Sequence, residues 1–290
     1  MEIKSSELII NPDGSVYHLN IKPEDLATNI ILVGDQNRVE KVSKHFDTIE
    51  FKAQKREFVT HTGTYKGKRF TVISSGIGPD NIDIVINELD ALVNIDFKTR
   101  QIKKELTALN IVRFGTSGSL QANIPVDAIV ASEYTIGLDN LMRSYIIDGK
   151  SETAIEDAFI AHTNWDLRKG RPYVFTGSEK LAAKFRNIPG VYPGFTATAG
   201  GFYGPQGRVL RLPIQDAELN HKMDNFNFKG INISNFEMET SAIYGLSKLL
   251  GHNALSLNAI IANRANGTFS QDPYLAVEKL IELGLKKLAE

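Results

Sequence analysis

Short apolar runs alternate with segments of helical periodicity along almost the whole chain. The run IILV at residues 30–33 ends at Gly34, and the charged segment after it carries Val39, Val42 and Phe46 on one helical face. Apolar runs of about 4–8 residues are typical of strands that are buried on both faces. Comparable strand patterns recur at residues 111–119, 126–136, 191–201, 230–239 and 254–267. The alternation predicts an α/β fold with a mixed, mostly parallel, twisted sheet flanked by helices.

The composition narrows the classes of partner and chemistry. The formal net charge is -1, so we expect neither nucleic acid nor an anionic membrane as a partner. The chain contains no cysteine, which excludes disulfides, thiolate catalysis and cysteine metal sites. No apolar stretch approaches the roughly 20 residues of a membrane span, and the N-terminus lacks the pattern of a secretory signal. We therefore expect a cytoplasmic protein.

No linker rich in proline, glycine or serine and no repeat interrupts the chain, so we expect one domain over residues 1–290. Residues 58–76 predict two strands joined by a turn at residues 66–68, and residues 97–110 predict a charged helix. Residues 139–186 contain the only tryptophan, Trp165, and suggest no chemistry. Further helices are predicted at residues 81–95, 216–226, 240–250 and 272–290.

Polar residues follow two of the predicted strands at the edge where ligands bind in such sheets. Gly34 and Arg38 follow the first strand, and Arg113 and Thr116 lie in the glycine-rich stretch RFGTSGS. Glycine with arginine at the start of a helix suits an anion such as phosphate. A lysine in the P-loop spacing is missing, which disfavours a Walker-type nucleotide site. Ordinary glycine turns with solvated arginines are the alternative.

The segment NFEMETS places two carboxylates close together. Glu237 and Glu239 alternate along an extended segment and share one side, with Met238 between them. The pair could bind a metal, act as acid and base, hold sugar hydroxyls or cap a helix N-terminus. No histidine is spaced with them as a ligand pair, so we predict no metal site.

The loop GGFYGPQGR, at residues 200–208, combines an aromatic ring, an amide and a guanidinium. Phe202, Gln206 and Arg208 are the types needed to stack on a flat heterocycle and hydrogen-bond its edge. A surface loop with one buried aromatic is the alternative. Arg264 follows another buried strand, after Asn263. Together with the anion and hydroxyl sites, this loop predicts a nucleoside bound beside a phosphate.

These motifs resemble the nucleoside phosphorylase family, and within it the uridine-specific members. The resemblance runs from about His18 to the C-terminal helix, through GDQNRVEK, REF, GIG, RFGTSG, FYGPQGR, NFEMETSA and IIANR. It implies a phosphate site formed by Gly34, Arg38, Arg113 and Thr116, with Arg56 supplied by a neighbouring subunit. It implies a ribose site formed by Glu237, Met238 and Glu239 with the neighbour's His18, and a base site formed by Phe202, Gln206, Arg208 and Arg264. Without the resemblance, His18 and Arg56 would be taken as structural or surface residues.

The implied reaction is reversible phosphorolysis of uridine to uracil and ribose 1-phosphate, with Arg208, Gln206 and Arg113 as catalytic residues. Inorganic phosphate would be a co-substrate, and no organic cofactor is implied. An amide both donates and accepts, so Gln206 can pair with O2 and N3–H of uracil, while Arg208 donates to O4. Purine-specific relatives carry an aspartate where this chain has Asn263 and Arg264. Another nucleoside (deoxyuridine, thymidine or a purine nucleoside) and a non-catalytic nucleoside-binding protein remain as alternatives.

Roles for Arg56 and His18 across an interface require a homodimer, and further assembly into a hexamer is left open. Some bacterial relatives hold a monovalent cation at this interface with a glutamate and a serine. Glu57 matches the glutamate, but Asn81 stands at the serine position, so the resemblance does not carry the cation over. The loop also reads GPQGR where bacterial relatives have PGQxR, and residues 94–106 are an insertion relative to compact bacterial members.

Overall fold

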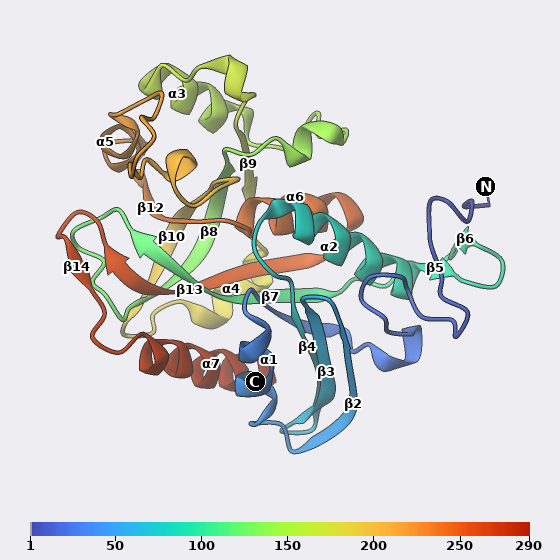
Figure 1. The fold of residues 1–290 in the computed structure, drawn as a ribbon. Helices are drawn as coiled ribbons and strands as arrows, with labels where there is room; N and C mark the ends of the chain where they lie inside the picture. Colours follow the sequence, from blue (N-terminus) through green and yellow to red (C-terminus); the bar gives the residue numbers. More distant parts are fainter. Residues whose placement is uncertain (1) are drawn as a thin grey trace.

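A large mixed sheet forms the centre of the molecule in the computed structural model, which describes residues 2–290 (Figure 1). Its strands follow the order β11–β12–β10–β8–β13–β7–β1–β4–β3–β2, with β9 paired to β8 and β14 paired to β13. The strands are β1 (Asn29–Val33), β2 (Thr48–Lys55), β3 (Phe58–Tyr65), β4 (Lys68–Ser74), β7 (Asn110–Ser119), β8 (Ile129–Gly137), β9 (Tyr173–Thr176), β10 (Val191–Thr198), β11 (Asn227–Phe228), β12 (Ile231–Glu237), β13 (Asn253–Asn263) and β14 (Thr268–Phe269).

The parallel pairs form two blocks of the sheet, which the antiparallel β8–β13 pair joins. β1 runs parallel to β4 and β7, β7 to β13, and β10 to both β8 and β12. The β2–β3 and β3–β4 hairpins are antiparallel and extend one edge. β12 also pairs with β7, through Asn235 opposite Ser119, so β7, β13, β8, β10 and β12 form a closed circuit. The predicted α/β fold is confirmed, and the closed circuit is a feature that local patterns did not indicate.

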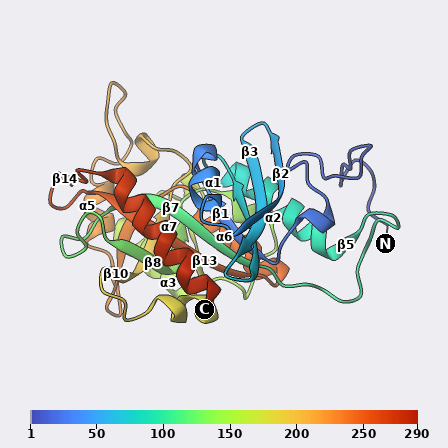
Figure 2. The ribbon, with the colours of Figure 1, turned by 90° about the horizontal axis from the view of Figure 1, so that it is seen from below.

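Helices cover both faces of the sheet. In Figure 1, α2 (Pro79–Asn94) and α6 (Thr240–Leu250) lie above the central strands, and α4 (Glu179–Ala182) and α7 (Pro273–Ala289) lie below them. Figure 2 shows α7 crossing this lower face. Leu89 and Leu246 belong to one apolar cluster, and Leu280 to another. The remaining helices are α1 (Gln36–Ser43), α3 (Thr153–Thr163) and α5 (Leu219–Asp224).

Several local predictions are confirmed. The turn at Lys66–Gly67 joins β3 and β4, and α1 follows β1 after Gly34. Helix α6 ends at Gly251, whose φ of 81° is one that a glycine adopts without strain. Helix α7 begins at Pro273 and is capped by the Asp272 side chain, which accepts from Leu275 N. No helix within residues 2–290 is both long and apolar enough to cross a membrane.

The predicted helix over residues 97–110 is wrong. This segment forms a small hairpin of β5 (Ile95–Asp96) and β6 (Gln101–Ile102), closed by a turn in which Asp96 accepts from Lys98 N and Thr99 N. The segment has no continuous buried face: Phe97 and Leu109, near its two ends, pack against the apolar core, but Ile102 and Leu106 between them are 67% and 64% exposed. A charged helix of that length is marginal without a buried face, so the turn prevails.

The glycine-rich loop expected within residues 111–119 is also wrong, because β7 continues through the whole segment. The strand requires a glycine at position 115, because a Cβ there would overlap the Arg113 guanidinium and crowd the Asn258 side chain. The glycine therefore makes room for a neighbouring arginine instead of forming a phosphate-binding turn.

Candidate active site

A cavity of about 560 Å³ opens at the carboxyl ends of β1 and β12, beside β7 and the end of β13. It brings together most of the predicted site residues. Its lining includes Gly34, Arg38, Arg113, Thr116, Phe202, Gln206, Arg208, Glu237, Met238 and Glu239. Residues more than 200 positions apart in the sequence thus contribute to a single cavity.

Two arginines and a helix start make part of the cavity suited to an anion. Asp35 caps α1 by accepting from Asn37 N at 2.9 Å, and this fixes the helix start next to Gly34. From the first turn of α1, Arg38 Nη1 donates to the carbonyl of Phe114 at 3.1 Å. Burial, and then the charge of Arg113, lower the pKa of Arg38. An anion between these two guanidinium groups would relieve their mutual repulsion.

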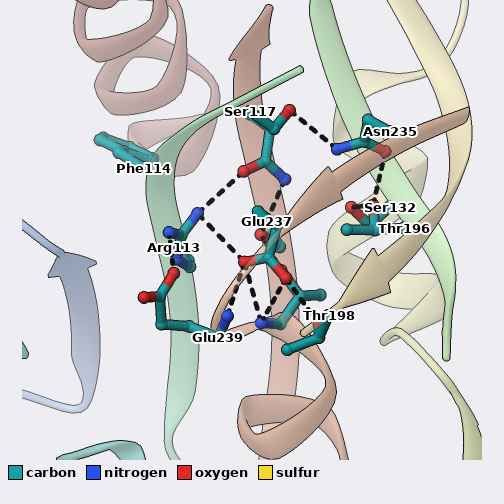
Figure 3. A network of polar contacts seen from close by, with 12 residues as sticks. Arg113, Phe114, Ser117, Ser132, Thr196, Thr198, Asn235, Glu237 and Glu239 are labelled. Carbon is teal, nitrogen blue, oxygen red and sulfur yellow. Dashed lines mark hydrogen bonds and ion pairs between the residues drawn. The ribbon is translucent and has the colours of Figure 1, made fainter. Parts of the chain in front are cut away.

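Arg113 lies in a buried polar network with both carboxylates (Figure 3). It is 5% exposed, its Nη2 donates to Glu239, and its Nη1 donates to Asn258 Oδ1 at 2.8 Å. Its Nη1 also lies 3.6 Å from Glu237 Oε2. Burial alone would lower the pKa of Arg113, but Glu239 and then Glu237 outweigh burial and raise it. The guanidinium therefore stays charged and fixed in place.

Glu239 has its two carboxylate oxygens in different contacts. One accepts from Arg113, and Oε1 accepts from Gly78 N at 2.8 Å. Burial raises the pKa of Glu239, against the opposing effect of the Arg113 charge. A carboxylate that is buried but lines a cavity can accept from ligand hydroxyls without losing its fixed position.

Glu237 fulfils the helix-capping alternative. Its Oε2 accepts from Glu239 N at 2.9 Å, and its Oε1 accepts from Thr240 N at 3.0 Å and from Thr198 Oγ1 at 2.6 Å. These contacts tie the start of α6 to the end of β10. Within the part of the chain described by the structure, no group of three or more histidine, aspartate or glutamate side chains is arranged to hold a metal ion.

Three side chains form a second polar group at the loop that follows β10. Gln206 is 2% exposed, and its Oε1 accepts from Arg208 Nη1 at 2.6 Å and from Arg264 Nη2 at 2.8 Å. Arg264 also donates to the Gln206 carbonyl at 2.9 Å and to Asn220 Oδ1 at 3.2 Å. Burial, with a smaller effect of Arg208, lowers the pKa of Arg264 to about 10. Gln206 and Arg208 line the cavity, whereas Arg264 is not part of its lining and holds Gln206 through these hydrogen bonds.

Phe202 lies at the mouth of the cavity and is 50% exposed. The Arg208 guanidinium lies 3.8 Å from the centre of its ring, so one ring face is covered. A flat ligand would stack on the other face or take the place of Arg208. The predicted stacking of Phe202 on a base stays a prediction.

His18 and Arg56 do not line this cavity. His18 lies near the N-terminus and contacts Glu88 of α2, with Nδ1 2.6 Å from Oε1. Arg56 is exposed in the turn between β2 and β3, with a φ of 54°. Their predicted contribution from a second subunit therefore stays a prediction, as does the absence of an interface cation near Glu57 and Asn81.

The sequence motifs missed several residues that shape the site. Gly78 N holds Glu239, Asn258 holds Arg113, and Ile77, Phe236 and Phe269 line the cavity. The glycine-rich turn GIGPD gave a signal for Gly78, since it follows β4 at the same edge of the sheet. A polar Asn258 inside the apolar run of β13 was a second signal. Phe269 had none, because its position depends on the short β13–β14 pairing.

The fold and the cavity offer a place for a small anion beside a polar ligand. Residues 28–289 match the family model of the phosphorylase superfamily, and the chain belongs to this family.

Individual relatives agree with this assignment. A solved nucleoside phosphorylase of Trypanosoma brucei, described as showing uridine phosphorylase activity, superposes with a TM-score of 0.86 at 30% identity, covering 97% of this chain and 99% of that one. A uridine phosphorylase of Thermococcus kodakarensis is 27% identical over 99% of this chain and 91% of its own length. A DeoD-type purine nucleoside phosphorylase of Bacillus thuringiensis is 28% identical over 92% of this chain and 96% of its own length.

Proposed function

We propose that this chain is a uridine phosphorylase, which converts uridine and inorganic phosphate to uracil and ribose 1-phosphate and catalyses the reverse reaction. The observation that carries the proposal is that Gln206 and Arg208 line the same cavity as Arg38, Arg113 and Glu239. Gln206 is held there by hydrogen bonds from Arg208 and Arg264. We also propose a role in pyrimidine salvage in the cytoplasm.

In this proposal, phosphate lies against Gly34, Arg38, Arg113 and Thr116 and attacks C1′ of the ribose. Glu239 accepts from the 2′- and 3′-hydroxyls, and Met238 packs on the sugar. The C1′–N1 bond breaks through an oxocarbenium-like state, so its electron pair and a negative charge pass to the uracil. Positioning the phosphate beneath C1′ removes much of the entropic barrier of a two-substrate reaction.

The charge on the departing uracil develops at O2 and O4. Binding the base would exchange the Arg208–Gln206 hydrogen bond for one from Arg208 to O4. The freed lone pair of Gln206 Oε1 could then accept from N3–H, while its Nε2 donates to O2. Donors that are held in a buried site stabilise the transition state more than the ground state.

Asn263 argues against a purine nucleoside, despite the similarity to DeoD-type enzymes. Its Nδ2 donates to the carbonyls of Gln121 and Ile124 at 2.9 and 2.8 Å, and its Oδ1 accepts from Asn266 N. The side chain is 1% exposed and carries no titratable proton to give to a purine nitrogen. Asn263 thus secures the surrounding loops.

Release of free base from uridine, inosine and thymidine, with and without inorganic phosphate, tests the proposal. We expect uracil release from uridine only with phosphate, together with ribose 1-phosphate, while inosine stays intact. Uracil release without phosphate would indicate a hydrolase and remove the roles given to Arg38 and Arg113. Cleavage of inosine would overturn the assignment of the base end.

A further inference from the structure

A second cavity, of about 700 Å³, lies behind the loop that carries Gln206 and Arg208. The proposed reaction does not use it. Trp165 and the segment from Tyr203 to Asp216 form most of its wall, and among residues 2–290 only Arg208 lines both cavities. Figure 2 shows a loop, coloured as this part of the chain, projecting from the body of the molecule.

The wall of this second cavity is mainly apolar. Its aliphatic lining includes Leu138, Pro205, Leu210, Leu212, Ile214 and Leu219. Leu210 and Leu212 are 76% and 78% exposed, although both face a concave surface of the size that holds small organic molecules. Covering these two side chains with an apolar group would remove unfavourable contact with water.

Three cationic side chains line the same cavity: Lys169, Arg208 and Arg211. Among residues 2–290, no carboxylate forms an ion pair with any of the three. Arg208 donates only to the Phe202 carbonyl and Gln206 Oε1, and Lys169 Nζ lies 4.9 Å from the centre of the Trp165 ring. Among the described residues of the lining, the one acid is Asp216, which is paired with Lys222 at 2.8 Å and on which the charge of Lys169 also acts, so Arg208 and Arg211 are the cations with no acid beside them.

We propose that this second cavity binds an amphipathic organic anion, a small molecule with an apolar ring system and one carboxylate or sulfonate. The rings would cover Leu210 and Leu212 and lie near Trp165, and the anionic group would lie among Lys169, Arg208 and Arg211. Such a ligand would draw Arg208 away from Gln206 and weaken the binding of uridine. This inhibitory effect rests on the proposed function, whereas the binding itself does not.

The probe is 8-anilinonaphthalene-1-sulfonate, with N-phenyl-1-naphthylamine as the neutral molecule of nearly the same shape. The lone tryptophan lines the cavity, so quenching of Trp165 reports binding without any turnover. We expect one sulfonate molecule per chain, and weaker binding of the neutral probe.

The variant K169Q/R211Q removes two charges outside the catalytic site, and Lys150→Gln removes an exposed charge elsewhere. We expect the double variant to weaken the sulfonate about tenfold, as two partly exposed charge contacts would. Lys150→Gln should leave its affinity unchanged, and the neutral probe should bind all three proteins alike. Equal sulfonate affinity in wild type and K169Q/R211Q would overturn the proposal, as would displacement of the probe by inorganic phosphate alone.

Turnover gives a separate test of the inhibitory effect. Without probe, K169Q/R211Q should cleave uridine with wild-type kinetics. With the sulfonate, the KM for uridine should rise in wild type and rise much less in the double variant. Equal inhibition of both proteins would mean that the probe acts in the first cavity. If neither protein cleaves uridine, the proposed function fails while the fluorescence result still decides whether the second cavity binds the anion.

Discussion

The amide oxygen of Gln206 accepts hydrogen bonds from two arginines. Because the side chain is also buried, these contacts hold it in a single orientation. Its contacts explain why a short loop with 3₁₀ geometry can present a defined polar edge. Arg208 is the less enclosed of the two arginines, and it stacks on the exposed ring of Phe202.

We expect Arg208→Ala to lower kcat/KM for uridine by about 10²–10³-fold, because it removes a donor to the charge on O4. The matched control is Arg168→Ala, whose side chain is 85% exposed and pairs only with Asp166. Steady-state kinetics of both variants, with circular dichroism to verify folding, measure the difference. Near-normal activity of Arg208→Ala would contradict the proposed base site.

His61 makes stability depend on pH. Burial, and then the charge of Lys52, lower the pKa of His61 below its ordinary value of 6.5. Below that pH the unfolded chain binds a proton that the folded chain does not yet bind, so stability falls as the pH falls. We expect His61→Gln to lose less stability than wild type between about pH 7.5 and about pH 5.5 in denaturant unfolding. The exposed His162→Gln should behave like wild type, and equal losses in all three proteins would refute this origin.

At the scale of elements, the junction between β12 and α6 both stabilises the start of the helix and contributes a carboxylate to the cavity. Glu237 caps the helix, while Glu239 two residues later points into the cavity. The cap therefore fixes the direction of the carboxylate that the proposal assigns to ribose.

We expect Glu237→Ala to lower the free energy of unfolding by about 1–3 kcal/mol, because Glu239 N and Thr240 N lose their buried acceptor. Glu237→Gln should lose less, since an amide oxygen can still accept from one of them. The control is Glu105→Ala, in the exposed segment after β6. Chemical denaturation measures the differences, and a Glu237→Ala protein as stable as wild type would show that water satisfies the helix start.

At the scale of the whole molecule, two residues predicted to come from a neighbouring subunit do not line the cavity of their own chain. Arg56 and His18 lie outside the cavity, so the proposed dimer must supply them. Mixing two weakly active variants tests this. In a mixed dimer of Arg56→Ala and Arg208→Ala chains, one site would hold both an intact Arg56 and an intact Arg208.

We expect each variant alone to be weakly active, and refolding the two together to restore about half of the wild-type activity per mixed dimer. Refolding each variant with itself is the control. No restoration would mean that Arg56 acts within its own chain, and full activity of Arg56→Ala would mean that it has no role in phosphate binding.

Local patterns in the sequence determined the order of strands and helices, the ends of α6 and α7, and the chemistry after β1, β10 and β12. These features depend on near neighbours, through side-chain periodicity, caps and turn residues. For that reason Gly34, Arg38, Glu239 and Gln206, which the structure places in the lining of one cavity, could be picked out in advance. The same local signals failed at residues 97–110, where Ile102 and Leu106 stay exposed and no continuous buried face supports a helix.

Only the tertiary structure decided which of these residues meet. Arg113 and Glu239 are 126 residues apart, and Arg264 and Gln206 are 58 apart, so no local pattern reports their contact. The closure of β12 onto β7 and the second cavity behind the Gln206 loop depend in the same way on distant segments. Local propensity is a property of a few consecutive residues, whereas a site is formed by long-range packing, which the chain reaches only when it folds.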